Sequence, residues 1–284
     1  MLETLVAEPT ADFALIDSGH GRKLERCGPY RFIRPEPQAM WSPAAAEWTA
    51  DGEFVGGSDE DGGGKWRLSE KVPAAWRVEQ AGVALNAMCT PFRHLGFFPD
   101  MAPHWEALRQ VSAGGEVLNL FGYTGVASLV AAQAGARVVH VDASKKAVEQ
   151  AKANAAASGL SDHPIRWLTE DARKFVAREV RRGRRYDAIL LDPPKFGRGP
   201  DGEVWEFTRD LPALLADCAR LLDGESRLLI LTTYAIRLSA IALEGLMREA
   251  TAHLPGKVTA GEMTIREEQR GLLLPTAIFA RWTR

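Results

Sequence analysis

The amino-acid sequence predicts an α/β fold: a doubly wound, mostly parallel sheet of seven strands with an antiparallel C-terminal hairpin, plus a small N-terminal β-rich module. From residue 104 onward, apolar runs of strand length alternate with amphipathic stretches of helix length. Such alternation is typical of parallel strands joined by right-handed crossovers. The last two apolar runs are joined by a loop too short to hold a helix, so we expect them to pair antiparallel.

The first 98 residues are expected to form the small module. Short β-type runs broken by turns lie at 12–18, 30–38, 47–55, 65–68 and 76–88, and the last one turns back on itself at 80–82. A Gly/Asp-rich stretch at 56–64 and four of the eight tryptophans also lie in these 98 residues. We expect the tryptophans to fill a core and pair across strands rather than stack on bases. The predicted domains are therefore residues 1–98 and 99–284.

The second part opens with a helix at 104–111, after which the elements follow in regular order. Strands are predicted at 116–121, 138–144, 165–171, 186–194 and 226–234. The helices that follow them are predicted at 126–135, 145–159, 172–183, 211–224 and 239–254. The closing hairpin is predicted from strands at 257–265 and 272–282.

Composition narrows the function classes. The 35 Lys and Arg nearly balance the 37 Asp and Glu, so no global positive field attracts nucleic acid and any RNA contact must be local. The widely spaced Cys27, Cys89 and Cys218 fit neither a disulfide framework nor a zinc site, and we expect no metal. Neither a membrane-spanning run nor a signal peptide is visible, so we expect a soluble, cytoplasmic protein without a membrane partner. The oligomeric state has no signal in the sequence.

Glycines and carboxylates follow the first three predicted strands of the sheet, at the edge where open α/β sheets bind ligands. The first strand ends in NLFGYTG (119–125), whose glycines let the backbone approach a ligand and whose next helix start can bind a carboxylate. Asp142 ends the second strand, placed to accept both hydroxyls of a ribose or, with Ser144, to cap a helix. Asp171 ends the third, placed to accept from the amine of adenine or to cap the helix that begins at Ala172.

The fourth strand ends in DPPKF (192–196). Two prolines directly after a buried strand fix a rigid, extended turn, which would position the carboxylate of Asp192 for a second substrate. Together the four strand ends predict a nucleotide-like cofactor. NAD is the rival, but the loop reads G-x-x-G rather than G-x-G-x-x-G.

Two loops should flank this edge. The Gly-rich stretch 196–210 is predicted to be a mobile substrate loop, and the turn of the terminal hairpin should also lie there. The substrate-contacting residues expected from them are Lys195, Phe196, Arg198, Trp205, Arg266 and Arg270. The arginine run in 178–187 precedes the fourth strand, so we expect it at the opposite edge of the sheet, as a solvated helix end.

These motifs resemble the S-adenosylmethionine (SAM)-dependent ribosomal RNA methyltransferase family of large-subunit cytosine-5 and guanine enzymes. The resemblance covers residues 94–284 and includes HLGFFPDMAPHW (94–105), NLFGYTG, VDAS, the strand end at Asp171 and LDPPKF. It implies a class I methyltransferase sheet with SAM as cofactor. The implied sites are a lid at Phe97, Phe98 and Asp100; the methionine end at Phe121, Gly122, Thr124 and Gly125; the ribose at Asp142; adenine at Asp171 and Ala172; and the methyl acceptor at Asp192 and Pro193. We add Asn119, Ala143, Ser144 and Asp192 to the cofactor-binding residues and Lys195 to the catalytic ones.

The sequence departs from that family at one position that matters for the chemistry. Cytosine-5 methylation needs a thiolate that adds to C6, yet the segment after the fifth strand reads LTTYAIRLS, without cysteine. Cys218 is expected in the core of a helix, and Cys89 precedes the domain. Transfer to an exocyclic amine or another nitrogen is therefore a competitor, with Asp192 and the Pro193 carbonyl accepting the amine hydrogens.

Three hypotheses remain open. The first is a methyltransferase acting on a nucleic-acid base, in ribosomal RNA, with the N-terminal module presenting the RNA. The second is a methyltransferase acting on a protein or a small molecule. The third is a non-catalytic SAM- or nucleotide-binding domain, against which the presence of Asp192 counts.

Overall fold

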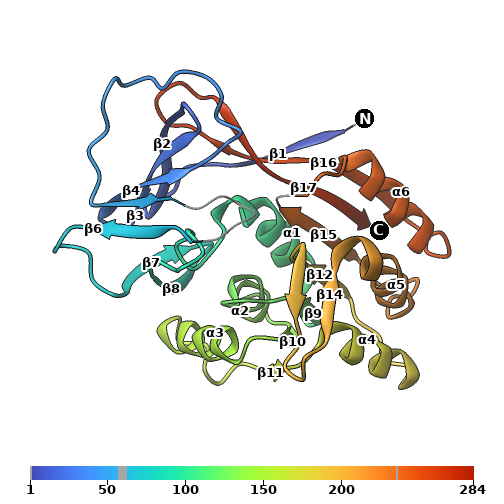
Figure 1. Cartoon of the computed structure of the whole chain (residues 1–284). Helices are drawn as coiled ribbons and strands as arrows, with labels where there is room; N and C mark the ends of the chain where they lie inside the picture. Colours follow the sequence, from blue (N-terminus) through green and yellow to red (C-terminus); the bar gives the residue numbers. More distant parts are fainter. Residues whose placement is uncertain (1, 57–62, 235) are drawn as a thin grey trace. The chain divides into compact units, whose positions relative to one another are not determined.

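The computed structural model describes residues 2–56, 63–234 and 236–284, which divide into two compact units (Figure 1). The α/β unit comprises Met1–Thr4, His104–Glu262 and Ala277–Arg284, and the β unit comprises Leu5–Pro103 and Met263–Thr276. The cut after Pro103 lies close to the predicted boundary, but the turn of the terminal hairpin joins the β unit. Residues 57–62 of the Gly/Asp-rich stretch lie outside the described residues.

An eight-stranded sheet runs through the α/β unit in the order β1-β16-β17-β15-β12-β9-β10-β11. Its strands are β1 (Glu3–Ala7), β9 (Glu116–Leu120), β10 (Arg137–Asp142), β11 (Ile165–Thr169), β12 (Ala188–Leu191), β15 (Leu228–Tyr234), β16 (Lys257–Arg266) and β17 (Leu273–Thr283). The strands from β15 to β11 pair in parallel, whereas β17 pairs antiparallel with β15. The predicted doubly wound sheet with its C-terminal hairpin is thus confirmed, and β1 is an edge strand that the sequence did not indicate.

Helices cover both faces of this sheet (Figure 1). They are α1 (Ala102–Ser112), α2 (Val126–Gln133), α3 (Lys145–Ala157), α4 (Ala172–Arg181), α5 (Phe207–Arg220) and α6 (Ala240–Ala250). One buried cluster joins α4, α5 and α6 to the strands, with Leu118 and Leu191 packed among Phe175, Leu215 and Met247. Burying each such side chain contributes roughly 1.5–3 kcal/mol, so this face fixes β9 and β12 at the centre of the sheet.

The β unit holds a five-stranded sheet in the order β2-β3-β4-β5-β6 and a hairpin of β7 and β8. The strands are β2 (Phe13–Gly19), β3 (Arg22–Cys27), β4 (Tyr30–Pro35), β5 (Gly52–Val55), β6 (Lys65–Leu68), β7 (Trp76–Gln80) and β8 (Val83–Ala87). Phe32 stacks on Trp76 with ring centroids 5.3 Å apart and meets Trp66 edge-on at 5.7 Å. Trp66 also lies directly opposite Phe54 on the neighbouring strand, with ring centroids 5.4 Å apart, which confirms the expectation that tryptophans pair across strands.

The two arginines of the hairpin turn form ion pairs inside the β unit, and the substrate contact expected of them stays a prediction. Arg270 pairs with Glu267 at 2.5 Å and Asp17 at 3.1 Å, and donates to the carbonyl of Ser18 at 2.7 Å. The Nε of Arg266 donates to both carboxylate oxygens of Glu8, at 3.0 and 2.8 Å. Because its partners are buried acids, Arg270 holds the hairpin turn in place.

Candidate functional site

The order of strands in the α/β unit reverses between β9 and β12. From β9 the chain proceeds to β10 and β11 on one side, whereas β12 pairs with the other side of β9. Ligands of open α/β sheets bind outside the carboxyl ends of strands at such a switch point. The segments found there are the loop 121–125, Asp142, Asp171 and the turn 192–194. We call this set the switch-point edge.

The loop 121–125 between β9 and α2 has an unusual backbone. Phe121, Tyr123 and Gly125 have φ angles of 55°, 47° and 88°, in the left-handed region that favours glycine. Left-handed non-glycine residues cost of order 1–3 kcal/mol each and persist where the surroundings hold them. The loop leads into the first turn of α2, whose amide groups have no intrahelical acceptor and can bind an anion.

Asp142, at the end of β10, ties this loop to the next one. Its Oδ2 accepts a hydrogen bond from the amide of Tyr123 at 2.8 Å, and its Oδ1 accepts one from the amide of Ser144 at 2.8 Å. Burial raises the pKa of the Asp142 carboxyl, and the two amides partly offset that rise. A carboxylate has about four acceptor positions, so about two remain for the hydroxyls of a ribose.

A buried polar network that the sequence analysis missed supports the loop from beneath. Asn119 Nδ2 donates to Ser128 Oγ at 2.9 Å, and Ser128 Oγ lies 3.0 Å from His140 Nδ1. Burial lowers the pKa of His140 to about 3, so the imidazole is neutral. An ideal Cβ at Gly122 would lie 2.5 Å from His140 Cε1, so only glycine fits above the ring. The available signal was a polar residue inside each apolar run, VVHVD and VASLVAA.

This network changes the role expected of Asn119. Its side chain was predicted to bind cofactor, but the residue is buried and its amide is turned to Ser128. Among the described residues, neither Asn119 Oδ1 nor His140 Nε2 has a hydrogen-bond partner. Asn119 therefore supports the loop and does not line its surface.

Asp171 acts as a helix cap in the structure, the alternative that the sequence left open. Its Oδ1 accepts from the amides of Arg173 and Lys174 at 2.9 and 3.1 Å, and its Oδ2 pairs with the Arg173 guanidinium at 3.3 Å. About three of the four acceptor positions of this carboxylate are thus engaged, and the adenine contact expected of Asp171 and Ala172, the first residue of α4, stays a prediction. Ser144 likewise caps α3, accepting from the amide of Ala147 at 3.2 Å.

The turn after β12 is braced by Trp205. Residues 192–194 have no regular secondary structure, Asp192 is partly buried and Pro193 is buried. Trp205 Nε1 donates to the carbonyl of Pro194 at 2.6 Å, and its ring centroid lies 5.1 Å from that of Phe121. Trp205 is only 3% exposed, so the prediction that it contacts substrate is wrong: it joins the two loops of the switch-point edge from below.

In the stretch 196–210, predicted as a mobile loop, residues 196–206 form a hairpin and residues 207–210 begin α5. β13 (Phe196–Arg198) pairs antiparallel with β14 (Val204–Glu206), and Lys174 of α4 forms an ion pair with Glu203. Glycines hid these strands, because they weaken the strand pattern in a sequence. Phe196 is 57% exposed, and Lys195 and Arg198 are exposed as well, so these three stay available to a substrate.

No thiol of the described α/β unit lies at the switch-point edge. The segment at the end of β15, which has no cysteine in the sequence, places Thr232 and Thr233 there, and both are buried. Cys218 lies in the buried cluster of α5, confirming its predicted core position, and burial raises the pKa of its thiol. In the β unit, burial raises the pKa of both Cys27 and Cys89 to about 12. Among the described residues no group of His, Cys, Asp and Glu could hold a metal ion, and no helix is long and apolar enough to span a membrane.

The residues predicted to form a lid belong to the β unit. Phe97 is buried and meets Phe13 edge-on, with ring centroids 6.3 Å apart. Asp100 is buried and accepts a hydrogen bond from Thr276 Oγ1 at 2.7 Å. Their role over a cofactor stays a prediction.

Comparisons with known proteins agree with this architecture. A family model described as S-adenosylmethionine-dependent methyltransferase matches residues 57–257. A crystal structure of a SAM-dependent methyltransferase from Agrobacterium tumefaciens is 46% identical, with a TM-score of 0.94 over 99% of this chain and 93% of that one. A structure from Streptococcus mutans, 16% identical, shares the fold with a TM-score of 0.73 over 96% of this chain and 75% of that one.

Curated relatives match a shorter part of the chain. Ribosomal RNA large subunit methyltransferase I of Photobacterium profundum is 33% identical over 128 residues, which is 45% of this chain and 32% of that protein. Ribosomal RNA large subunit methyltransferase K/L of Magnetococcus marinus is 32% identical over 151 residues, 52% of this chain and 20% of that protein. The matches thus span about a third and a fifth of these relatives' lengths.

Proposed function

Because the chain belongs to the S-adenosylmethionine-dependent methyltransferase family, we propose that it transfers the methyl group of SAM to a nucleic-acid base, in ribosomal RNA. The observation that carries this proposal is the switch-point edge, where a strained loop, a carboxylate with unused acceptor positions and a proline-fixed acid meet on neighbouring strands. Action on ribosomal RNA also implies a cytoplasmic location.

The polar groups of the switch-point edge suit those of SAM. The loop at Phe121, Gly122, Thr124 and Gly125, together with the first amides of α2, would hold the methionine end through its carboxylate. Asp142 would accept the ribose hydroxyls with the acceptor positions that Tyr123 and Ser144 leave unused. The backbone at Asp171 and Ala172 would lie at the adenine, while Ala143 and Ser144 close the ribose side.

The turn that begins at Asp192 would serve the methyl acceptor. SAM, when bound, supplies an electrophilic methyl group on a sulfonium. The Asp192 carboxylate and the Pro193 carbonyl would accept the hydrogens of an amine and so direct its lone pair toward that methyl group. Trp205 keeps the turn still through its bond to Pro194, which makes this a reaction catalysed mostly by positioning. The absence of a thiol at this edge favours a nitrogen acceptor over carbon-5 of cytosine.

An RNA substrate is supported by exposed groups next to this turn and by the names of the relatives. Lys195 and Arg198 present positive charge and Phe196 an exposed ring directly after the proline pair. Exposed aromatic rings beside cations suit unstacked bases and their phosphates. In the β unit, Phe92 is 76% exposed and stacks on His94 with ring centroids 6.3 Å apart, which suits the RNA-presenting role of that unit.

Mass spectrometry of nucleosides from purified ribosomal RNA tests the proposal. A deletion strain should lack one methylated nucleoside that its parent has, and a plasmid copy of the gene should restore it. A copy carrying Asp192→Ala is the matched control and should not restore it. An unchanged set of nucleosides in the deletion strain, together with no methyl transfer from SAM to RNA by the purified protein, would refute an RNA substrate.

A further inference from the structure

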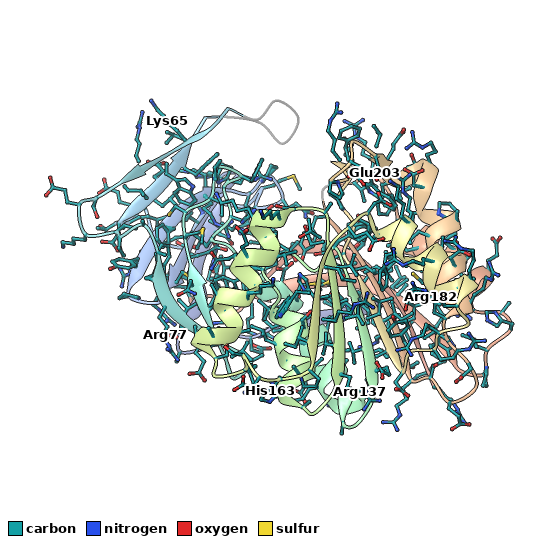
Figure 2. The ribbon with its side chains drawn as sticks, turned by 90° about the horizontal axis from the view of Figure 1, so that it is seen from below. Lys65, Arg77, Arg137, His163, Arg182 and Glu203 are labelled. Carbon is teal, nitrogen blue, oxygen red and sulfur yellow. The ribbon has the colours of Figure 1, made fainter. Side chains whose placement is uncertain are left out.

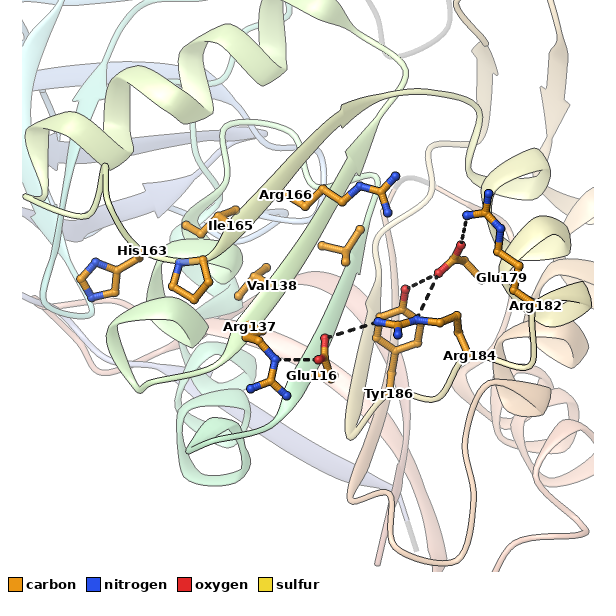
Figure 3. A pocket seen from close by; sticks show the side chains of 12 residues that line it. Glu116, Arg137, Val138, His163, Ile165, Arg166, Glu179, Arg182, Arg184 and Tyr186 are labelled. Atoms are coloured by element: carbon orange, nitrogen blue, oxygen red, sulfur yellow. Dashed lines mark hydrogen bonds and ion pairs between the residues drawn. The ribbon is translucent and has the colours of Figure 1, made fainter.

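A pocket of about 630 Å³ lies at the opposite edge of the sheet from the switch-point edge (Figure 3). Its walls come from the first residues of β9, β10 and β11, from the end of α4 and from the segment before β12. Figure 2 shows Arg137, at one of these strand starts, far from Glu203 on the hairpin beside the switch-point edge. Since the switch-point edge is formed by the carboxyl ends of the same strands, this pocket is a separate place on the unit.

The pocket carries a surplus of positive charge from separate segments of the chain. Four arginines and two glutamates line it, a formal charge of +2: Arg137, Arg166, Arg182, Arg184, Glu116 and Glu179. Arg137 is 59% exposed at its side chain and Glu179 only 3%, so the acids lie deeper than the guanidinium groups. The buried acids can therefore support the arginines from below, and the guanidinium groups stay accessible to a ligand.

The glutamates orient the arginines. Arg137 Nε lies 2.7 Å from Glu116 and Arg182 lies 3.1 Å from Glu179, while Arg184 reaches both acids at 3.9 and 3.8 Å. Tyr186 also donates to Glu179, at 3.0 Å (Figure 3). Each guanidinium has five N–H donors, so these pairs leave most of the donors for another partner. The side chains are therefore preorganised to bind an anion.

Arg166 distinguishes a binding pocket from a purely structural ion-pair network. It is exposed and lines the pocket, yet it forms no ion pair with a described residue. A network that served only to join strands and helix would not need this fourth arginine. Between the arginines, Val138 and Ile165 give the pocket an apolar wall that suits the uncharged part of a ligand.

We propose that this pocket binds a small phosphorylated anion of nucleotide size. Guanidinium groups match phosphate oxygens bidentately, and several of them together suit a ligand with more than one phosphate charge. The volume lies in the range of small-molecule sites and far exceeds that of a single phosphate. The apolar wall of Val138 and Ile165 between the arginines favours a small ligand over an extended nucleic-acid strand, which would need a longer basic stripe.

Calorimetry on the full chain with inorganic tripolyphosphate and with ATP tests the proposal. S-adenosylhomocysteine is present in excess, so that adenosine contacts at the switch-point edge cannot account for binding of ATP. Both probes should bind the parent protein, and Arg166→Gln should weaken each at least about tenfold, the loss expected for a charge-assisted contact. The control Arg248→Gln removes an exposed arginine that pairs with Glu244 on its own helix, and it should leave both affinities within about twofold.

Three results would overturn the proposal. One is no binding of either probe to the parent protein. Another is equal affinity of Arg166→Gln and Arg248→Gln. The third is an RNA oligonucleotide that needs Arg166 while neither small probe binds, which would assign the surface to nucleic acid. Because Arg166 forms no ion pair with a described residue, Arg166→Gln should keep the melting temperature of the parent. If that variant does not fold, Arg166→Lys replaces it: lysine keeps the positive charge but lacks the two-pronged guanidinium, so it should weaken the binding of both probes. A failure of methyl transfer would leave this measurement intact.

Discussion

The substitution Gly122→Ala, which adds one methyl group, tests whether the buried network of Asn119, Ser128 and His140 positions the loop 121–125. An ideal Cβ there would lie 2.5 Å from His140 Cε1 and 2.6 Å from His140 Nδ1, whereas optimal carbon contacts are about 3.5–4.0 Å. The imidazole or the loop must therefore move by about 1 Å, and a moved ring disturbs its 3.0 Å contact with Ser128 Oγ. Overpacking costs about 1–3 kcal/mol and the lost hydrogen bond about 1 more, so we expect Gly122→Ala to lower the free energy of unfolding by about 2–4 kcal/mol.

Urea denaturation and titration calorimetry with SAM measure the two consequences. The loop also carries the strained residues Phe121 and Tyr123, whose amides and carbonyls shift when the loop shifts. If about half of this loss of 2–4 kcal/mol is spent on restoring the loop conformation that binds SAM, the affinity for SAM should fall about tenfold, because that factor corresponds to about 1.4 kcal/mol. A parent-like affinity for SAM would refute the positioning role of the network.

Two further variants isolate the cause. Gly245→Ala places a methyl group on α6 with no atom within 4 Å, so it should raise stability by about 0.4–1 kcal/mol and leave SAM binding unchanged. In a double variant with His140→Ala, the ring that the new methyl group meets is gone. The loss caused by Gly122→Ala should then shrink by at least about 1 kcal/mol. An undiminished loss would show that His140 is not the obstacle.

Three other variants probe the switch-point edge and the thiols. Asp142→Ala should weaken SAM at least about tenfold in calorimetry, because a charge-assisted hydrogen bond contributes roughly 1.5–3 kcal/mol; unchanged affinity would remove the ribose assignment. Asp192→Ala should lower kcat about a hundredfold or more and leave SAM affinity within a few-fold, whereas a normal single-turnover rate, or a drop in melting temperature that parallels activity, would contradict a catalytic role. A triple alanine variant at Cys27, Cys89 and Cys218, if folded, should retain methyl transfer; loss of turnover with SAM binding intact would restore the cytosine-5 chemistry.

The alternation of strands and helices was predictable because burial on both sides of a parallel sheet leaves a strong apolar pattern. One strand of the β unit, β3, was not predictable in this way. β3 reads RKLERC, and its charges are tolerated because buried Glu25 pairs with Arg34 at 2.6 Å and Lys23 at 3.4 Å. Lys23 lies on β3 itself but Arg34 lies on β4, so a window limited to β3 could not have shown the nearer of the two cations.

The sequence predicted those parts of the candidate site whose position the backbone of the sheet determines. It predicted less well those parts whose role depends on side-chain contacts. The strand-end positions of Asp142 and Asp192 follow from the parallel sheet, and the structure bears out both placements. Asp171 was ambiguous because a capping aspartate and a ligand-binding aspartate occupy the same position in sequence. Trp205 was placed wrongly because its acceptor, the carbonyl of Pro194, comes within reach only once the glycine-rich stretch folds as a hairpin.

The β unit is assembled from two distant pieces of the chain, Leu5–Pro103 and Met263–Thr276. During translation, at roughly 5–20 residues per second, the first piece therefore waits about 10–30 s before the second is made. Until then the carboxylate of Asp17, at 0% exposure in the finished protein, lacks the guanidinium of Arg270 that pairs with it. The β unit therefore acquires its last contacts only after Met263–Thr276 has been made, and the α/β unit only after Ala277–Arg284 has followed.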